Sequence, residues 1–128
     1  MPLVRIALRR SASPERIGAI QQSVYQAMRE AFNVPQDDRF ILVSQHAPEE
    51  FIYDPGYLGI DRGDELVIVQ ITCNAGRTVA QKQALYRRLA ELLGASPGLR
   101  PEDVFVNLVE VPKENWSFGN GVGQYIDA

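Results

Sequence analysis

The pattern that most constrains this chain is a strand–helix–strand motif that occurs twice. In each half, a short apolar or alternating run is followed by an amphipathic stretch and then by a second apolar run. The predicted segments are 3–8, 11–32 and 39–46 in the first half, and 66–72, 78–94 and 104–111 in the second. The second strand follows Pro35-Gln36-Asp37, and the fourth follows the similar Pro101-Glu102-Asp103. We interpret the chain as a tandem duplication of one βαβ unit, with repeats at about 2–46 and 66–111.

Both predicted helices begin with recognisable capping residues. Ser13 is a favourable N-cap, and Pro14 suits the first helical position because its missing N–H would have no intrahelical partner there. In the second half, Thr78 and Gln81 have the spacing of a capping box, in which each side chain bonds the other residue's main-chain N–H. The two amphipathic stretches are therefore predicted to be helices.

Two βαβ units define a fold class. Each unit joins two parallel strands by a right-handed crossover. The chain is therefore predicted to have an α/β (α+β) fold, with a four-stranded sheet and both helices on one face. The opposite face would have no cover within the chain, which predicts self-association. Asn120-Gly121 is a strong turn signal and predicts a β-hairpin over 114–126, within a single domain that spans 1–128.

Composition argues against several functional classes. The 128-residue chain has a formal net charge of −3, so no overall positive field favours nucleic acid or anionic membranes. Cys73 is the single cysteine and His46 the single histidine, which leaves no basis for an intrachain disulfide or a metal site. We see no apolar run long enough to span a membrane, and arginines interrupt the apolar N-terminal stretch that a signal peptide would need. A cytoplasmic location is expected.

The first strand opens with a proline, in the sequence MPLVRIALRR. Proline is compatible with the first residue of a strand, where no ladder donor is needed. Removal of Met1 would give Pro2 a second role, because its secondary amine would then be the N-terminus. Free α-amines have a pKa of about 7.7–8.0, which suits proton transfer near neutral pH. The residue is therefore either a strand start or a catalytic amine.

Besides Pro2, five segments of the duplicated chain are distinctive in their order: VPQDDRF at 34–40, LVSQH at 42–46, GRTVAQK at 76–82, PEDV at 101–104 and NWSFGNG at 115–121. Together they resemble the tautomerase superfamily (4-oxalocrotonate tautomerase-like), and within it the malonate semialdehyde decarboxylase-like branch. The resemblance covers nearly the whole chain. It implies the tautomerase (MIF-like) fold, removal of Met1, a homotrimer of six βαβ units and a cofactor-free active site beside Pro2.

The resemblance also implies roles for two charged residues. Asp38 matches the position of the catalytic aspartate in the decarboxylase-like proteins, and Arg77 matches the substrate-binding arginine that both branches share. The decarboxylase-like pattern has a pair of arginines two residues apart after the third strand. Here Arg77 stands at the second of these positions, but Ala75 stands at the first. This difference weakens the decarboxylase hypothesis more than the proton-transfer hypothesis.

The residue types fit these roles. Arg77 precedes the N-cap Thr78, where helix N–H groups and a bidentate guanidinium together favour a carboxylate. Asp38 can orient a water molecule or hold Pro2 protonated, although Asp37 and Asp38 also suit a turn before a strand.

Aromatic residues near the C-terminus are the other candidates. Trp116, Phe118 and Tyr125 flank the predicted turn and could wall an apolar substrate pocket, or simply pack the hairpin. His46 is interpreted as structural, since the chain has no second histidine for a metal site or a proton shuttle. Cys73 lies at a strand end near Arg77, and the sequence shows no base that would support it as a nucleophile.

Three functional hypotheses follow. In the first, the protein is an isomerase, a keto–enol tautomerase of a small 2-oxo or enol carboxylate. Pro2 transfers the proton, Arg77 binds the carboxylate, Asp38 assists, and the aromatic hairpin closes the pocket. In the second, it is a lyase, a hydratase or decarboxylase of a 3-oxo acid such as malonate semialdehyde, with Pro2 as general acid and Asp38 activating water. In the third, it is a non-enzymatic trimeric interaction protein. The physiological substrate is not predicted.

Overall fold

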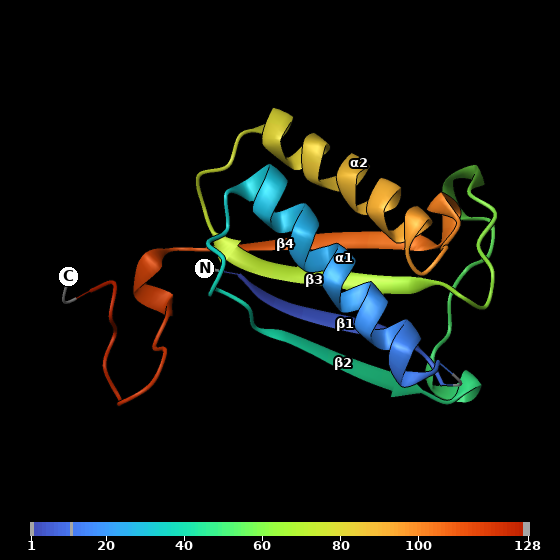
Figure 1. The fold of residues 1–128 in the computed structure, drawn as a ribbon, viewed down its shortest axis with the longest axis horizontal. Helices are drawn as coiled ribbons and strands as arrows, with labels where there is room; N and C mark the ends of the chain where they lie inside the picture. Colours follow the sequence, from blue (N-terminus) through green and yellow to red (C-terminus); the bar gives the residue numbers. More distant parts are fainter. Residues whose placement is uncertain (1, 11, 127–128) are drawn as a thin grey trace.

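The computed structural model describes residues 2–10 and 12–126, so the expected removal of Met1 lies outside the described residues. Within them, four strands form one sheet in the order β2-β1-β3-β4 (Figure 1). The strands are β1 (Leu3–Arg9), β2 (Ile41–His46), β3 (Val67–Asn74) and β4 (Val104–Val111). β1 runs parallel to β2, and β3 runs parallel to β4, which confirms the two predicted βαβ crossovers.

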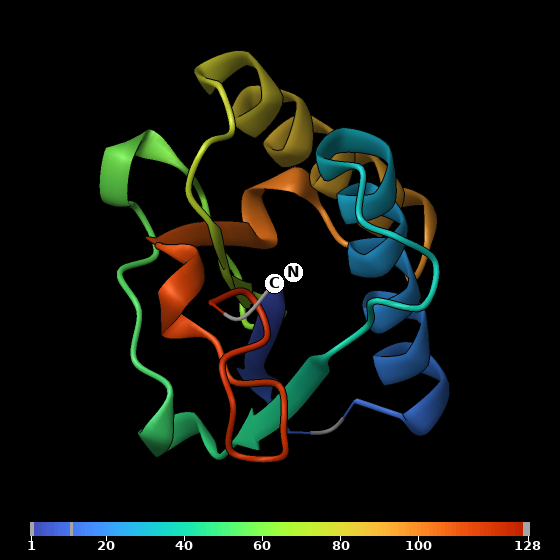
Figure 2. The same cartoon turned by 90° about the vertical axis from the view of Figure 1, so that its left-hand side faces the viewer.

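The two long helices, α1 (Pro14–Phe32) and α2 (Val79–Ala95), lie side by side on one face of the sheet (Figures 1 and 2). Their predicted starts are confirmed. The Ser13 side chain accepts a hydrogen bond from the Arg16 N–H at 3.1 Å, and Thr78 and Gln81 form the reciprocal capping box. The α1 hydroxyl of Ser23 also donates to the carbonyl of Ser96 just beyond α2, at 2.6 Å. The helix layer is therefore tied together as well as packed on the sheet.

The hydrophobic core lies between the helices and the sheet. Successive strand residues point to opposite faces, so alternate residues of β1 and β3 are buried beneath the helices. The main contributors are Val4, Ile6 and Leu8 of β1, Val67, Val69, Ile71 and Cys73 of β3, Val24 and Met28 of α1, and Leu85, Leu89 and Leu93 of α2. The apolar periodicity of the sequence therefore matches the observed core.

The antiparallel pairing of β1 with β3 joins the two units. Leu3 pairs with Thr72 and Val4 with Ile71. Extending this register by one residue places Pro2 beside Cys73. β3 continues to Asn74, two residues beyond its predicted end, because it pairs with β4 as far as Val111. The start of β1 and the end of β3 consequently share one end of the sheet.

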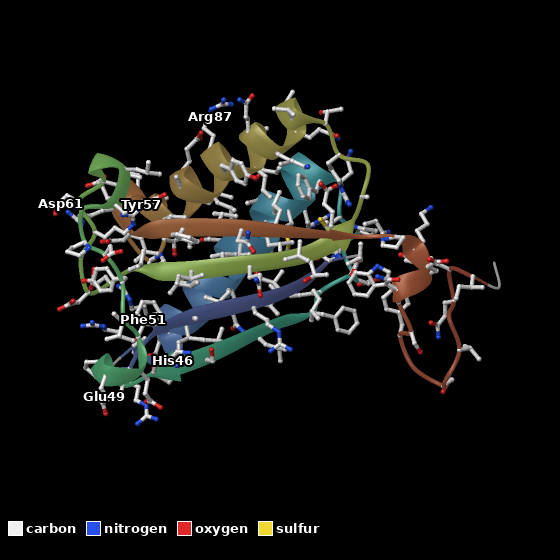
Figure 3. The ribbon with its side chains drawn as sticks, turned by 180° about the vertical axis from the view of Figure 1, so that it is seen from behind. His46, Glu49, Phe51, Tyr57, Asp61 and Arg87 are labelled. Carbon is white, nitrogen blue, oxygen red and sulfur yellow. The ribbon has the colours of Figure 1, made fainter. Side chains whose placement is uncertain are left out.

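The sheet face opposite the helices is partly apolar and open, as predicted (Figure 3). Leu42 of β2 is 53% exposed and Phe105 of β4 is 43% exposed. Between them, the Gln70 amide donates to the Asn107 side chain at 3.1 Å. This face combines apolar edges with a polar centre.

The predicted C-terminal hairpin is present as a turn without strands. Gly119 and Val122 form an isolated bridge around Asn120 and Gly121, which have φ angles of 61° and 70°. The next N–H along the first arm, that of Phe118, donates to the side chain of Gln124 at 2.8 Å rather than to a carbonyl of the opposite arm. This side-chain bond replaces the ladder, so no strand extends from the turn.

Candidate active site

Pro2 lies in a pocket at the end of the sheet where β1 begins. The pocket has a volume of about 230 Å³. Its lining residues are Pro2, Leu3, Phe40, Trp116, Ser117 and Phe118. In Figures 1 and 2 the C-terminal segment, in orange and red, lies at this end of the sheet, next to the start of β1. The structure therefore brings together the first strand and the C-terminal aromatic residues.

Pro2 is a buried residue at the edge of this pocket. It shares the parity of Val4 and Ile6, so it continues the row of β1 side chains that faces the helices. Its neighbour Leu3 has the opposite parity and contributes to the pocket wall. A group held here would be shielded from bulk water on its protein side while one side faces a cavity.

Two of the three predicted aromatic residues line the pocket, and the third supports them. The rings of Trp116 and Phe118 are stacked, with centroids 5.4 Å apart and an interplanar angle of 15°. Tyr125 meets Phe118 edge-on, with centroids 5.2 Å apart, and is not among the lining residues. The Trp116 indole N–H donates to the Asn74 side-chain oxygen at 2.7 Å. This bond fixes the indole against the end of β3.

Arg77 lies outside the pocket lining, in the loop between β3 and α2. Its guanidinium donates to the carbonyl of Asn74 at 3.1 Å and to that of Phe32 at 3.3 Å, and its central carbon lies 4.7 Å from the centroid of the Phe32 ring. Among residues 2–10 and 12–126, no carboxylate forms an ion pair with Arg77. Its two main-chain acceptors are neutral, so the positive charge has no direct counter-ion there.

The loop that carries Arg77 is held by a neighbouring ion pair. Glu110 of β4 accepts from the Gly76 N–H at 3.3 Å and from the Lys82 ammonium at 2.5 Å. The hydrogen bond from Lys82 is the main cause that lowers the pKa of Glu110, and the same bond raises the pKa of Lys82. Gly76 has a φ of 126°, a backbone conformation that residues other than glycine rarely adopt. The turn before Arg77 therefore depends on a glycine and on Glu110.

Asp38 is buried beside the start of β2 and is 8% exposed. Burial raises the pKa of Asp38, and the positive charge at the start of the chain partly opposes this shift. Asp38 is not among the pocket-lining residues. The neighbouring Arg39 places its guanidinium carbon 4.3 Å from the centroid of the Tyr25 ring, which supports a packing role for this arginine.

The remaining candidates differ in their distance from Pro2. Cys73 is 1% exposed and faces the core beside Pro2; burial raises the pKa of its thiol, while the Arg77 charge acts in the opposite direction. His46 lies at the far end of the sheet beside Phe51, 6.0 Å between ring centroids, and its Nε2 is 3.1 Å from the Ser44 hydroxyl (Figure 3). His46 is therefore separate from the pocket.

Sequence analysis did not identify four residues that shape this site. Leu3, Phe40 and Ser117 line the pocket, and Asn74 anchors Trp116. Leu3 had only the signal of a strand residue, Phe40 and Ser117 belong to segments of the resemblance but were given no role, and nothing in the sequence joins Asn74 to Trp116. The strand register was needed to bring these positions together.

A second hollow lies at the opposite end of β1, beside the start of β3 and the first turn of α1. Its lining includes Arg9, Arg16, Asp64 and Glu65. Arg9 pairs with Asp64 at 3.0 Å, and Arg16 approaches Glu65 at 3.5 Å. These two ion pairs account for four of the lining charges, while Arg10, a third arginine of the lining, forms no ion pair among the residues that the structure describes.

No cluster of three or more His, Cys, Asp or Glu side chains in 2–10 and 12–126 is arranged to hold a metal ion. Within the same residues, neither α1 nor α2 has the length and apolar character of a transmembrane helix.

Comparison with known proteins gives consistent matches along the whole chain. Two models of tautomerase enzymes match residues 2–59 and 38–119. A probable tautomerase of Bacillus subtilis (strain 168), YusQ, is 42% identical over 127 residues, which are 99% of this chain and 100% of that protein.

Solved structures give a similar result. A crystal structure of malonate semialdehyde decarboxylase, reported with its decarboxylase and hydratase activities, is 32% identical with a TM-score of 0.91, over 98% of this chain and 96% of that one. FG41 malonate semialdehyde decarboxylase inhibited by 3-bromopropiolate is 35% identical with a TM-score of 0.90, over 98% and 95% of the two chains. A fused 4-OT symmetric trimer, 24% identical with a TM-score of 0.77 over 94% of each chain, shares the fold.

The burial of Asp38 leads to a prediction about stability and pH. Because its pKa is raised on folding, the folded state holds the proton more tightly than the unfolded chain does. The free energy of unfolding should therefore fall as pH rises from 3.8 through the folded-state pKa, and stay lower above it. Asp38→Asn removes this titration, so we expect the variant to be more stable than wild type at pH 7.

Urea unfolding at pH 7, 5 and 3 measures this effect. The stability gained by Asp38→Asn should shrink as pH falls below 3.8, where the wild-type carboxyl is protonated in both states. Asp37→Asn, at the exposed neighbouring position, is the control for removing one negative charge. A gain that is independent of pH, or equal in the control, would contradict the interpretation.

Proposed function

This chain belongs to the tautomerase family, and we propose that it is a cofactor-independent enzyme that uses Pro2 to transfer a proton on a small 2-oxo or enol carboxylate. One observation carries the proposal. Pro2 is buried at the start of β1 and lines a pocket whose other walls include Trp116 and Phe118. A proline that served only to begin a strand would have no need of such a cavity.

The proposed chemistry begins with the free amine of Pro2 after removal of Met1. The lone pair of the ring nitrogen takes a proton from the carbon next to the substrate's carbonyl, and the carbonyl oxygen becomes the enolate oxygen. Return of the proton to oxygen completes the conversion to the enol, and the reverse order converts the enol to the ketone. Aromatic walls favour this step, because apolar surroundings disfavour the charged ammonium and so lower the pKa of the amine towards neutrality.

In this proposal Arg77 attracts the substrate's carboxylate. Its charge has no ion-pair partner among the described residues, and its two bonds to main-chain carbonyls leave other guanidinium N–H groups for an anion. The adjacent start of α2 adds positive potential. Because Asn74 contacts both Arg77 and Trp116, the arginine and the aromatic pocket belong to one connected group of residues.

A second reaction on the same site has specific support. Two solved structures that resemble this chain with TM-scores of 0.91 and 0.90 are malonate semialdehyde decarboxylases. In the corresponding proposal, Pro2 is protonated, Asp38 activates water, and a 3-oxo acid is hydrated or decarboxylated. Ala75 weighs against this alternative, since the decarboxylase-like pattern has an arginine there. The protonation state of Pro2 distinguishes the two proposals.

Pro2→Ala is expected to keep the fold and lose most of the activity. Alanine is compatible with a strand start, and β1 loses no ladder hydrogen bond. A primary amine differs in basicity and is less fixed in direction than the ring nitrogen, so the rate on an enol carboxylate such as phenylenolpyruvate should fall by about 10²-fold or more. The pH profile should contain a limb that moves in the variant: wild-type activity that rises with pH indicates a base, and activity that falls indicates an acid.

A labelling experiment tests the same residue independently. Processed enzyme is incubated with 3-bromopropiolate, and the adduct is mapped by mass spectrometry; we expect modification of Pro2. Modification elsewhere, together with full activity of Pro2→Ala, would make the proline only the first residue of a strand.

Arg77→Ala should reduce kcat/KM for carboxylate substrates, with a loss of about 2–4 kcal/mol in transition-state stabilisation. This is the loss expected when one partner of a charged hydrogen bond is removed. Arg77→Lys should restore only part of this loss, because lysine lacks the bidentate fork. Arg87→Ala is the matched control, since Arg87 is exposed on α2 away from the pocket (Figure 3). Equal kinetics for wild type and all three variants would assign Arg77 a structural role.

We also propose that the protein is a homotrimer in which the open sheet face is covered by neighbouring copies. Sedimentation equilibrium should give three times the chain mass of 14.3 kDa at micromolar concentration. Phe105→Asp places a charge on the open face and should weaken assembly, whereas Val79→Asp, on an α2 residue that is 71% exposed, should not. A stable wild-type monomer would remove the oligomer from the proposal.

A further inference from the structure

The C-terminal segment, residues 112–126, is attached to the rest of the chain by few polar contacts. Its main-chain bonds, such as Asn115 N–H to Pro112 and Ile126 N–H to Gly123, begin and end within the segment. The Gln124 side chain likewise bonds the Phe118 N–H and the Gly119 carbonyl. Among the described residues, the bond from the Trp116 indole to Asn74 is the one side-chain hydrogen bond that joins this segment to the sheet.

Asn74 occupies a position that reaches both sides of the proposed site. It is the last residue of β3, where its pairing with Val111 ends the β3–β4 ladder. Its side-chain oxygen accepts from Trp116 at 2.7 Å, and its main-chain carbonyl accepts from Arg77 at 3.1 Å. One residue therefore contacts the aromatic wall through its side chain and the arginine through its backbone.

We propose that Asn74 is a positioning residue that holds Trp116, and through it the stacked Phe118, against the pocket of Pro2. The inference concerns the site of the proposed function and rests on that function for its kinetic consequences. Its structural part is independent: removal of the Asn74 acceptor should release the indole while the sheet and helices remain. The segment beyond Val111 would then have no side-chain hydrogen bond to the sheet within the described residues.

Trp116 is the only tryptophan in the chain, so its fluorescence reports directly on this anchor. Asn74→Ala removes the acceptor, and we expect the emission to shift to longer wavelength and acrylamide quenching to increase. Asn74→Asp keeps an oxygen acceptor of nearly the same shape and should restore both signals. Asn115→Ala removes the same amide one residue from Trp116, at an exposed position, and should leave both signals unchanged. Far-UV circular dichroism confirms that each variant is folded.

Kinetics test the connection with the site. Asn74→Ala should lower kcat/KM by about tenfold, the factor that corresponds to loss of one neutral hydrogen bond. Trp116→Phe removes the same hydrogen bond from the other side. If the bond is the route of the effect, adding Asn74→Ala to Trp116→Phe should cause no further loss, because the acceptor no longer has a donor to hold.

The outcomes separate this inference from the proposed function. Unchanged fluorescence in Asn74→Ala, or an equal change in Asn115→Ala, overturns the anchor whatever the activity. Changed fluorescence with unchanged kcat/KM overturns the positioning role and leaves a structural contact. A wild-type protein without activity on any 2-oxo, enol or 3-oxo carboxylate would overturn both the proposed function and the positioning role, while the fluorescence comparison would still decide the anchor.

Discussion

The antiparallel pairing of β1 with β3 is the interaction on which the arrangement of this molecule depends. It is the one strand pair within the described sheet that joins the two βαβ units, since β2 pairs with β1 and β4 with β3. Its register sets the start of β1 beside the end of β3. Pro2 therefore lies next to Cys73, and the residues that follow β3, including Arg77, begin at the same edge. A shift of one residue would exchange the core-facing and open-face side chains of one strand relative to the other.

The electrostatics around the pocket give each charged group a different character. Lys82 and Glu110 pair, and each stabilises the charged form of the other. Burial instead favours the neutral forms of Asp38 and Cys73, because it raises the pKa of both groups. A neutral thiol is a poor nucleophile, and a paired ammonium is a poor base at neutral pH. These conditions are consistent with assigning the proton transfer to the amine of Pro2.

Much of the fold could be predicted because it follows from local patterns. Apolar periodicity located the strands and helices, and capping residues such as Ser13 and Thr78 located the helix starts. The site was less predictable because its parts meet only through tertiary packing. Of the three aromatic candidates, Trp116 and Phe118 line the pocket and Tyr125 does not, whereas Asn74 has the sequence signal of an ordinary strand end. The predicted hairpin strands were wrong and only the turn was correct. Asn120-Gly121 specifies a turn, but it cannot ensure that the flanking residues pair as strands.

The duplication also has a consequence for the number of chain ends. A single repeat that assembled from separate copies would carry an amino terminus at the start of every unit. In the fused chain, the unit that begins near Glu65 is preceded by peptide, so its first strand starts with an amide nitrogen that has no basic lone pair. The hollow at that end is lined by two ion pairs and by Arg10. The second repeat therefore offers no basic main-chain nitrogen at its first strand, and the proposed amine chemistry falls to the repeat that begins with Pro2.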